Sequence, residues 1–144
     1  MPKPNEPYAG DEEVGEVVRR FESCELPPAD FNHREHLIVA LCYLRLMRDD
    51  EALARLRARI GLYAAAHGVN PSLYNETITV FWLRRVRAFM ARAGGRHGLT
   101  EMTNRLTEEC GGSRLIFEYY SRELIESEAA RRGWAEPDLK PLDF

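Results

Sequence analysis

His33 and His36 are the side chains in this sequence whose type and spacing point most directly to chemistry. They stand three residues apart in FNHREHLIVA, residues 31–40, so a helix that begins here carries both imidazoles on one face. A neutral imidazole binds metal ions, and the same ring exchanges protons near neutral pH. We therefore expect the pair to form half of a site, either as metal ligands or as an acid–base set.

A carboxylate that would complete such a site is Glu76, in LYNETIT, residues 73–79. The helical spacing of Thr79 and Leu83 extends back by one turn to Glu76 or to its neighbour Asn75. A carboxylate on the buried side of a helix needs a partner, and the two histidines are available. Two histidines and one carboxylate suit iron, manganese or zinc. The predicted metal ligands are thus His33, His36 and Glu76, and the wider set of ligand-binding candidates adds Tyr43, Tyr74 and Asn75.

The same residues also have a structural interpretation. Histidines in the first turn of a helix are often partly exposed and inert, and a carboxylate near a helix N-terminus is stabilised by the helix dipole. Asn32 and Glu35 form a capping-box pattern, so folding accounts for both of them. The alternative hypothesis is a non-catalytic helical binding or interaction module, for example a homodimer, in which the His/Glu cluster is a structural polar network.

Helical periodicity covers most of the chain. Apolar residues recur at helical spacing in six segments, which begin near residues 11, 33, 49, 72, 99 and 113, and the last segment has a break near Ser121. No segment shows sustained strand alternation. The sequence therefore predicts an all-α compact bundle of about five to seven helices, a single domain over residues 11–144. The proline-rich residues 1–10 are predicted to form a flexible N-terminal arm. In the tail, Trp134, Leu139 and Leu142 are expected to pack on the bundle.

Composition excludes several classes of protein. The 144 residues carry a formal net charge of −3, which argues against a general nucleic-acid binder. Three cysteines without a CxxC spacing argue against a disulfide scaffold or a zinc ribbon. The chain has no apolar run of membrane-spanning length and no secretory signal at its polar start. We expect a cytoplasmic protein with a small-molecule ligand and with neither nucleic acid nor membrane as a partner.

Three motifs together resemble a family of small bacterial proteins for which no activity is established. The motifs are FNHREHLIVALCYL, LYNETITVFWL and YYSRELIESEAARRGWAEPDLKPL, and they lie between residue 31 and about residue 142. The family pattern reads F-x-H-R-x-H-L, then Y-H-E-T-I-T, then Y-Y-S and W-x-x-P-D-L-x-P-L. Carried over residue by residue, the pattern matches His33, Arg34, His36, Tyr74, Glu76 and Thr77, and the resemblance favours a site over an inert histidine pair. This chain departs from the pattern at Asn75, where the family usually has histidine. If that position were an obligatory metal ligand, asparagine would weaken the site here, whereas asparagine would serve if the position begins the helix or only supports the ligands.

Overall fold

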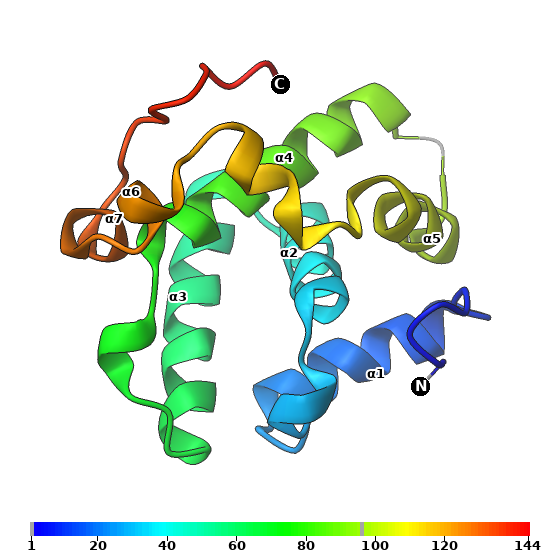
Figure 1. Ribbon diagram of the computed structural model, residues 1–144. Coiled ribbons are helices and arrows are strands. Elements are labelled where there is room, and N and C mark those ends of the chain that lie inside the picture. Colours follow the sequence, from blue (N-terminus) through cyan, green and yellow to red (C-terminus); the bar gives the residue numbers. More distant parts are fainter. Residues whose placement is uncertain (1, 96) are drawn as a thin grey trace.

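The apolar helix predicted after Asn32 runs through the middle of the molecule. In the computed structural model, which describes residues 2–95 and 97–144, α2 (His33–Leu46) lies between its neighbours in Figure 1. It packs against α1 (Asp11–Glu22), α3 (Asp49–Ala66), α4 (Glu76–Ala93) and α5 (Leu99–Cys110). Every residue from 37 to 44 is buried, because each side of this helix faces another helix.

Short helices connect and finish the bundle. They are η1 (Pro28–Asp30), η2 (Pro71–Leu73), η3 (Ser113–Glu118), α6 (Arg122–Ile125) and α7 (Glu128–Arg132). The described residues form no strand, and the predicted all-α bundle is confirmed. No helix within them has the length and the apolar character that crossing a bilayer requires.

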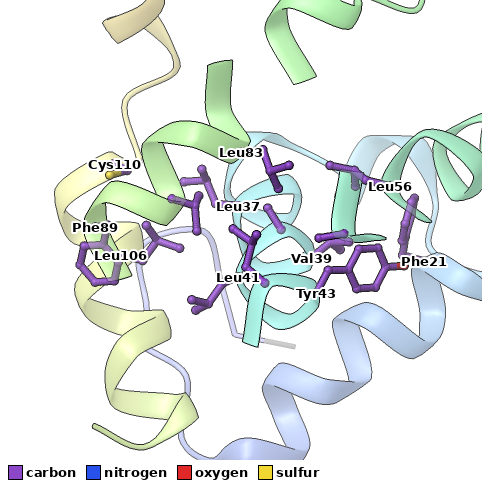
Figure 2. Packing of buried hydrophobic residues seen from close by; sticks show 14 of the residues in the cluster. Phe21, Leu37, Val39, Leu41, Tyr43, Leu56, Leu83, Phe89, Leu106 and Cys110 are labelled. Carbon is purple, nitrogen blue, oxygen red and sulfur yellow. The ribbon is translucent and has the colours of Figure 1, made fainter. Parts of the chain in front are cut away.

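The main core surrounds α2, and each of the longer helices contributes to it. Figure 2 shows Leu37 and Leu41 of α2 between Leu83 of α4 and Leu106 of α5, with Phe21 of α1 on the far side. A second cluster forms around Phe81, which is fully buried against η3 and α6. Burial of these side chains is the main favourable contribution to folding.

The position of one helix start and the cap of another differ from the sequence-based expectation. α4 begins at Glu76 rather than near Ser72, because Asn75 is its N-cap and accepts a hydrogen bond at Oδ1 from the backbone N–H of Ile78 at 3.0 Å. Asn32 occupies the N-cap position of α2 but does not cap it with its side chain. Its Nδ2 donates instead to the carbonyl of Ala29 at 2.9 Å.

The N-terminal segment, predicted to be a flexible arm, makes specific contacts with α2 and α5. The Arg34 guanidinium donates to the backbone carbonyls of Lys3, Pro4 and Glu6. It also lies over the ring of Tyr8, 4.5 Å from the centroid, and Tyr8 is buried. The side chain of Asn104 on α5 exchanges two hydrogen bonds with the Tyr8 backbone. Residues 3–8 are therefore docked on the bundle, while Met1 lies outside the described residues.

The C-terminal tail is held on α4 and on the second core cluster. The Thr77 hydroxyl donates to the carbonyl of Gly133 at 2.8 Å and accepts from the N–H of Ala135 at 3.0 Å. Trp134 and Leu142 pack against the cluster around Phe81, as predicted. Leu139 was expected to do the same, but 56% of its surface is exposed.

Candidate functional site

A cavity of about 530 Å³ lies at the N-terminal end of α2, between α2, α3, α4 and η3. Four of the predicted site residues line it: His33, His36, Tyr74 and Asn75. Its remaining walls are largely apolar and are formed by Leu37, Ala40, Leu56, Ile60, Leu73, Ile78, Thr79, Trp82, Leu83, Ser113, Ile116 and Phe117. Its volume lies within the range typical of small-molecule sites.

His33 is held in one tautomer by the end of α5. Its Nε2 lies 2.9 Å from the carbonyl oxygen of Cys110. A carbonyl can only accept, so Nε2 carries the proton and Nδ1 of the neutral ring is an acceptor. Burial lowers the pKa of His33, against the opposing effect of the carbonyl bond. This imidazole is therefore neutral near pH 7, with an unprotonated Nδ1.

His36 lies deeper, one turn further along α2. Its ring stacks on Phe31, with the centroids 3.8 Å apart. Burial, together with the charge that His33 would carry, lowers the pKa of His36 to about 4. Among residues 2–95 and 97–144, no side chain or backbone group forms a hydrogen bond with its ring nitrogens. His36 thus gives the cavity a neutral polar group without a protein partner.

Aromatic side chains that the sequence did not single out form part of the cavity wall. The ring of Trp82 meets His33 edge-on, with the centroids 4.3 Å apart, and Phe117 of η3 also lines the cavity. The signal available for Trp82 was its spacing, because it lies four residues after Ile78 and next to Leu83, which belongs to the predicted buried stripe of α4. No local signal marks Phe117, since η3 reaches the cavity only through the fold.

Tyr74 and Asn75 form the rim of the cavity between η2 and α4. The Tyr74 hydroxyl donates to Oε1 of Glu76 at 2.7 Å. Burial, which is the larger cause, and the Glu76 carboxylate, which is the smaller one, raise the pKa of Tyr74 to about 12. Besides capping α4, Asn75 donates through Nδ2 to the carbonyl of Ile125 at 2.7 Å. Asn75 therefore joins α4 to α6, and the departure from the family pattern falls on a residue with a structural role.

Glu76 does not meet the histidines, so the predicted convergence of the three groups is wrong. Its carboxylate faces α3, where Arg57 donates to both oxygens, with Nε 2.9 Å from Oε1. Burial raises the pKa of Glu76, but the hydrogen bonds from Arg57 and Tyr74 outweigh it and hold the pKa below its usual range. Because α4 starts at Glu76, its neighbour Asn75 takes the place on the cavity side.

The geometry does not support the predicted metal site. In the part of the chain that the structure describes, no three His, Cys, Asp or Glu side chains are placed together as ligands for a metal ion. The histidine pair lacks its third ligand because Glu76 is bound to Arg57. The residues present do not fit the iron, manganese or zinc site that the sequence predicted.

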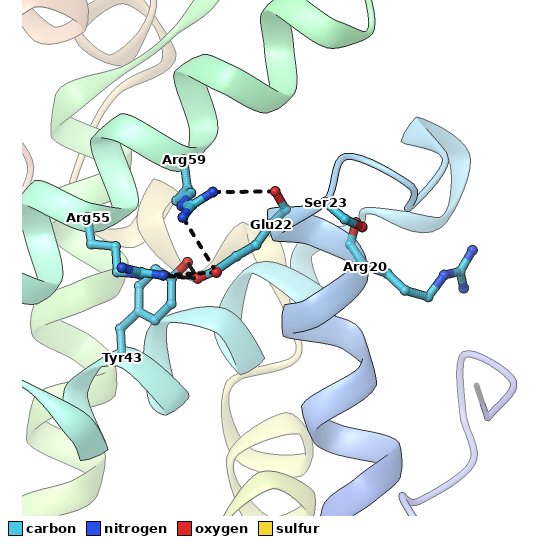
Figure 3. A network of polar contacts seen from close by, with 6 residues as sticks. All are labelled: Arg20, Glu22, Ser23, Tyr43, Arg55 and Arg59. Carbon is cyan, nitrogen blue, oxygen red and sulfur yellow. Dashed lines mark hydrogen bonds and ion pairs between the residues drawn. The ribbon is translucent and has the colours of Figure 1, made fainter.

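Tyr43 belongs to a different polar cluster and does not line the cavity. Its hydroxyl donates to Oε1 of Glu22 at 2.6 Å, and Arg55 and Arg59 also bind Glu22 (Figure 3). Burial and the Glu22 carboxylate raise the pKa of Tyr43. Tyr43 lies two turns after His36 on the same helix. This separation is enough to bring the Tyr43 hydroxyl to α1 and α3 instead of the cavity.

Comparison of the chain with protein-family models, curated proteins and solved structures gave no match. The resemblance to a bacterial family stays a prediction, and the function is argued from the cavity alone.

Proposed function

We propose that the protein binds a small, mostly apolar molecule in the cavity at the N-terminal end of α2. The observation that carries the proposal is His36, whose ring nitrogens face no protein partner in a largely apolar enclosure. The ring of His36 is largely but not completely removed from water. A ligand that supplies the hydrogen bond its nitrogens lack therefore gains affinity. The ligand is then an apolar body with at least one group able to donate to or accept from an imidazole.

A binding experiment with 1-octanol tests this proposal. The chain has two tryptophans, and only Trp82 lines the cavity, so the Trp134→Phe variant reports on the cavity through the emission of Trp82. We expect saturable quenching or a spectral shift on titration with 1-octanol, and calorimetry of the unmodified protein provides a second measurement.

Filling the cavity supplies the matched control. Ala40 lines the cavity, whereas Ala52 is buried in the core away from it. Ala40→Leu should weaken binding at least tenfold and leave the fold intact, since the added atoms enter empty space. Ala52→Leu should lower the free energy of unfolding by about 1–3 kcal/mol through overpacking and leave the affinity unchanged. Equal affinity in all three proteins would contradict the proposal.

A second candidate function is acid–base catalysis, and the tautomer of His33 favours it. An imidazole whose Nε2–H donates to a fixed carbonyl presents Nδ1 as a base, and a lowered pKa keeps that base unprotonated at pH 7. The discriminating variant is His33→Gln, assayed with any ligand found by the experiment above. If both proteins bind the ligand and neither converts it to a product, binding is the function. If the unmodified protein converts the ligand and the variant does not, catalysis is established.

A further inference from the structure

The cavity shares a wall with a second hollow on the surface of the molecule. This charged cleft, of about 940 Å³, is lined by Arg57, Pro71, Ser72, Tyr74, Glu76, Glu128, Arg131 and Arg132. The wall is the segment 71–76, in which Leu73 and Asn75 line the cavity while Ser72 and Glu76 line the cleft. Tyr74 lines both, so the two hollows adjoin at this residue.

The charges in the cleft are almost, but not fully, balanced. Arg57 is paired with Glu76, and Arg132 is paired with Glu128 at 2.6 Å. Arg131 is half-buried at the cleft, and its guanidinium has no hydrogen-bond or ion-pair partner among the described residues. The cleft therefore carries about one positive charge without a counter-ion, on a chain whose formal net charge is −3.

The adjoining cavity has the opposite character, since none of the described Asp, Glu, Lys or Arg side chains lines it. A charged group of a ligand cannot enter this cavity without losing its hydration, and the neutral imidazoles offer little compensation. A ligand that carries a charge must therefore place it outside the cavity, and the cleft beyond Tyr74 is the neighbouring polar space.

We propose that the ligand is an amphipathic monocarboxylic acid, with its apolar body in the cavity and its carboxylate against Arg131 in the cleft. The proposal rests on the proposed binding function and names the class of ligand. A guanidinium matches a carboxylate with two parallel hydrogen bonds, which a neutral end group cannot reproduce. One negative charge fits, because a second one would have to displace Glu76 or Glu128 from its arginine.

Two probes of equal length separate this inference from simple cavity binding. The first is 8-hydroxyoctanoate, which has a hydroxyl for the histidine end and a carboxylate for the cleft. The second is 1,8-octanediol, which keeps the hydroxyl and replaces the carboxylate by a neutral group. We expect the acid to bind the Trp134→Phe protein about tenfold more tightly than the diol at low ionic strength, with the difference shrinking as salt is added.

Arg131→Gln should reduce the affinity for the acid to that for the diol and leave the diol unchanged, while Arg131→Lys should keep part of the difference. The matched control is Arg132→Gln, because Arg132 lines the same cleft but is already paired with Glu128. Melting curves of these variants show whether each is folded. Equal affinities of acid and diol for the unmodified protein, or an acid preference that survives Arg131→Gln, would overturn the inference and leave cavity binding standing. If neither probe nor 1-octanol binds, the proposed function fails, and this inference fails with it.

Discussion

The Nε2–H of His33 donates to the carbonyl oxygen of Cys110 at 2.9 Å, a contact between residues 77 positions apart in the chain. It joins the first turn of α2 to the last residue of α5. Directly after Cys110 the chain turns at Gly111 and Gly112 into η3, which forms one wall of the cavity. The position of this carbonyl therefore fixes both the tautomer of His33 and the start of the cavity wall.

Replacing Gly111 should disturb this contact. A Cβ atom at Gly111 would lie 2.3 Å from the backbone oxygen of Thr107, so Gly111→Ala must displace the end of α5. We expect the free energy of unfolding to fall by about 2 kcal/mol, and the His33 ring resonances to shift in NMR spectra. Gly112→Ala is the matched control, since nothing lies within 4 Å of its added Cβ. Equal stability of the two variants would show that α5 does not end in this geometry.

The low pKa of His36 predicts a specific dependence of stability on pH. The folded-state pKa of about 4 lies below the ordinary value of 6.5, so the unfolded chain binds more protons between these values. The contribution of His36 to stability is therefore lost as pH falls from about 6.5 to about 4, by on the order of 3 kcal/mol. His36→Gln, which does not titrate, should flatten this part of the curve measured by denaturant unfolding. An NMR titration that places the His36 midpoint near 6.5 would contradict the burial of the ring.

Glu76 should contribute to stability through Arg57 rather than through the histidines. Glu76→Gln weakens the paired bonds at the start of α4, and because Arg57 is half-exposed we expect a loss of roughly 1 kcal/mol in thermal or denaturant unfolding. A double-mutant cycle with Arg57→Met should show a coupling energy of similar size. The same cycle with His36→Gln should show none. A divalent metal that stabilises the unmodified protein, and loses this effect in Glu76→Gln, would instead restore the metal hypothesis.

The docked N-terminal segment should depend on Arg34. Arg34→Met removes the donors that hold the carbonyls of Lys3, Pro4 and Glu6, and it removes the cation above Tyr8. We expect faster amide hydrogen exchange and proteolytic cleavage within residues 3–9, while the exchange of α2 remains slow. The control is Arg48→Met, which removes an exposed arginine paired only with its close neighbours in the sequence. Unchanged exchange in the Arg34 variant would mean that residues 3–8 are held without it.

The local sequence determined the helices and the histidine pair. Val14, Val17 and Phe21 stand at helical spacing and form the buried face of α1, and the apolar residues that follow His36 suit the central position of α2. Gly68, at a φ of 67°, follows the end of α3 in the left-handed conformation that glycine adopts at this position. These features depend on residues three or four apart, which the sequence displays directly.

The tertiary structure alone decided which side chains meet at the site. Asn75 and Glu76 are adjacent in the chain, yet Asn75 lines the cavity while the carboxylate of Glu76 binds Arg57 on α3. Trp82 of α4 and Phe117 of η3 line the cavity, and the carbonyl of Cys110 at the end of α5 binds His33. A residue on a helix turns by about 100° from its neighbour, so a partner in another helix depends on where both helices begin and how they pack. Spacing within one segment could therefore locate the two histidines but could not select the groups that surround them.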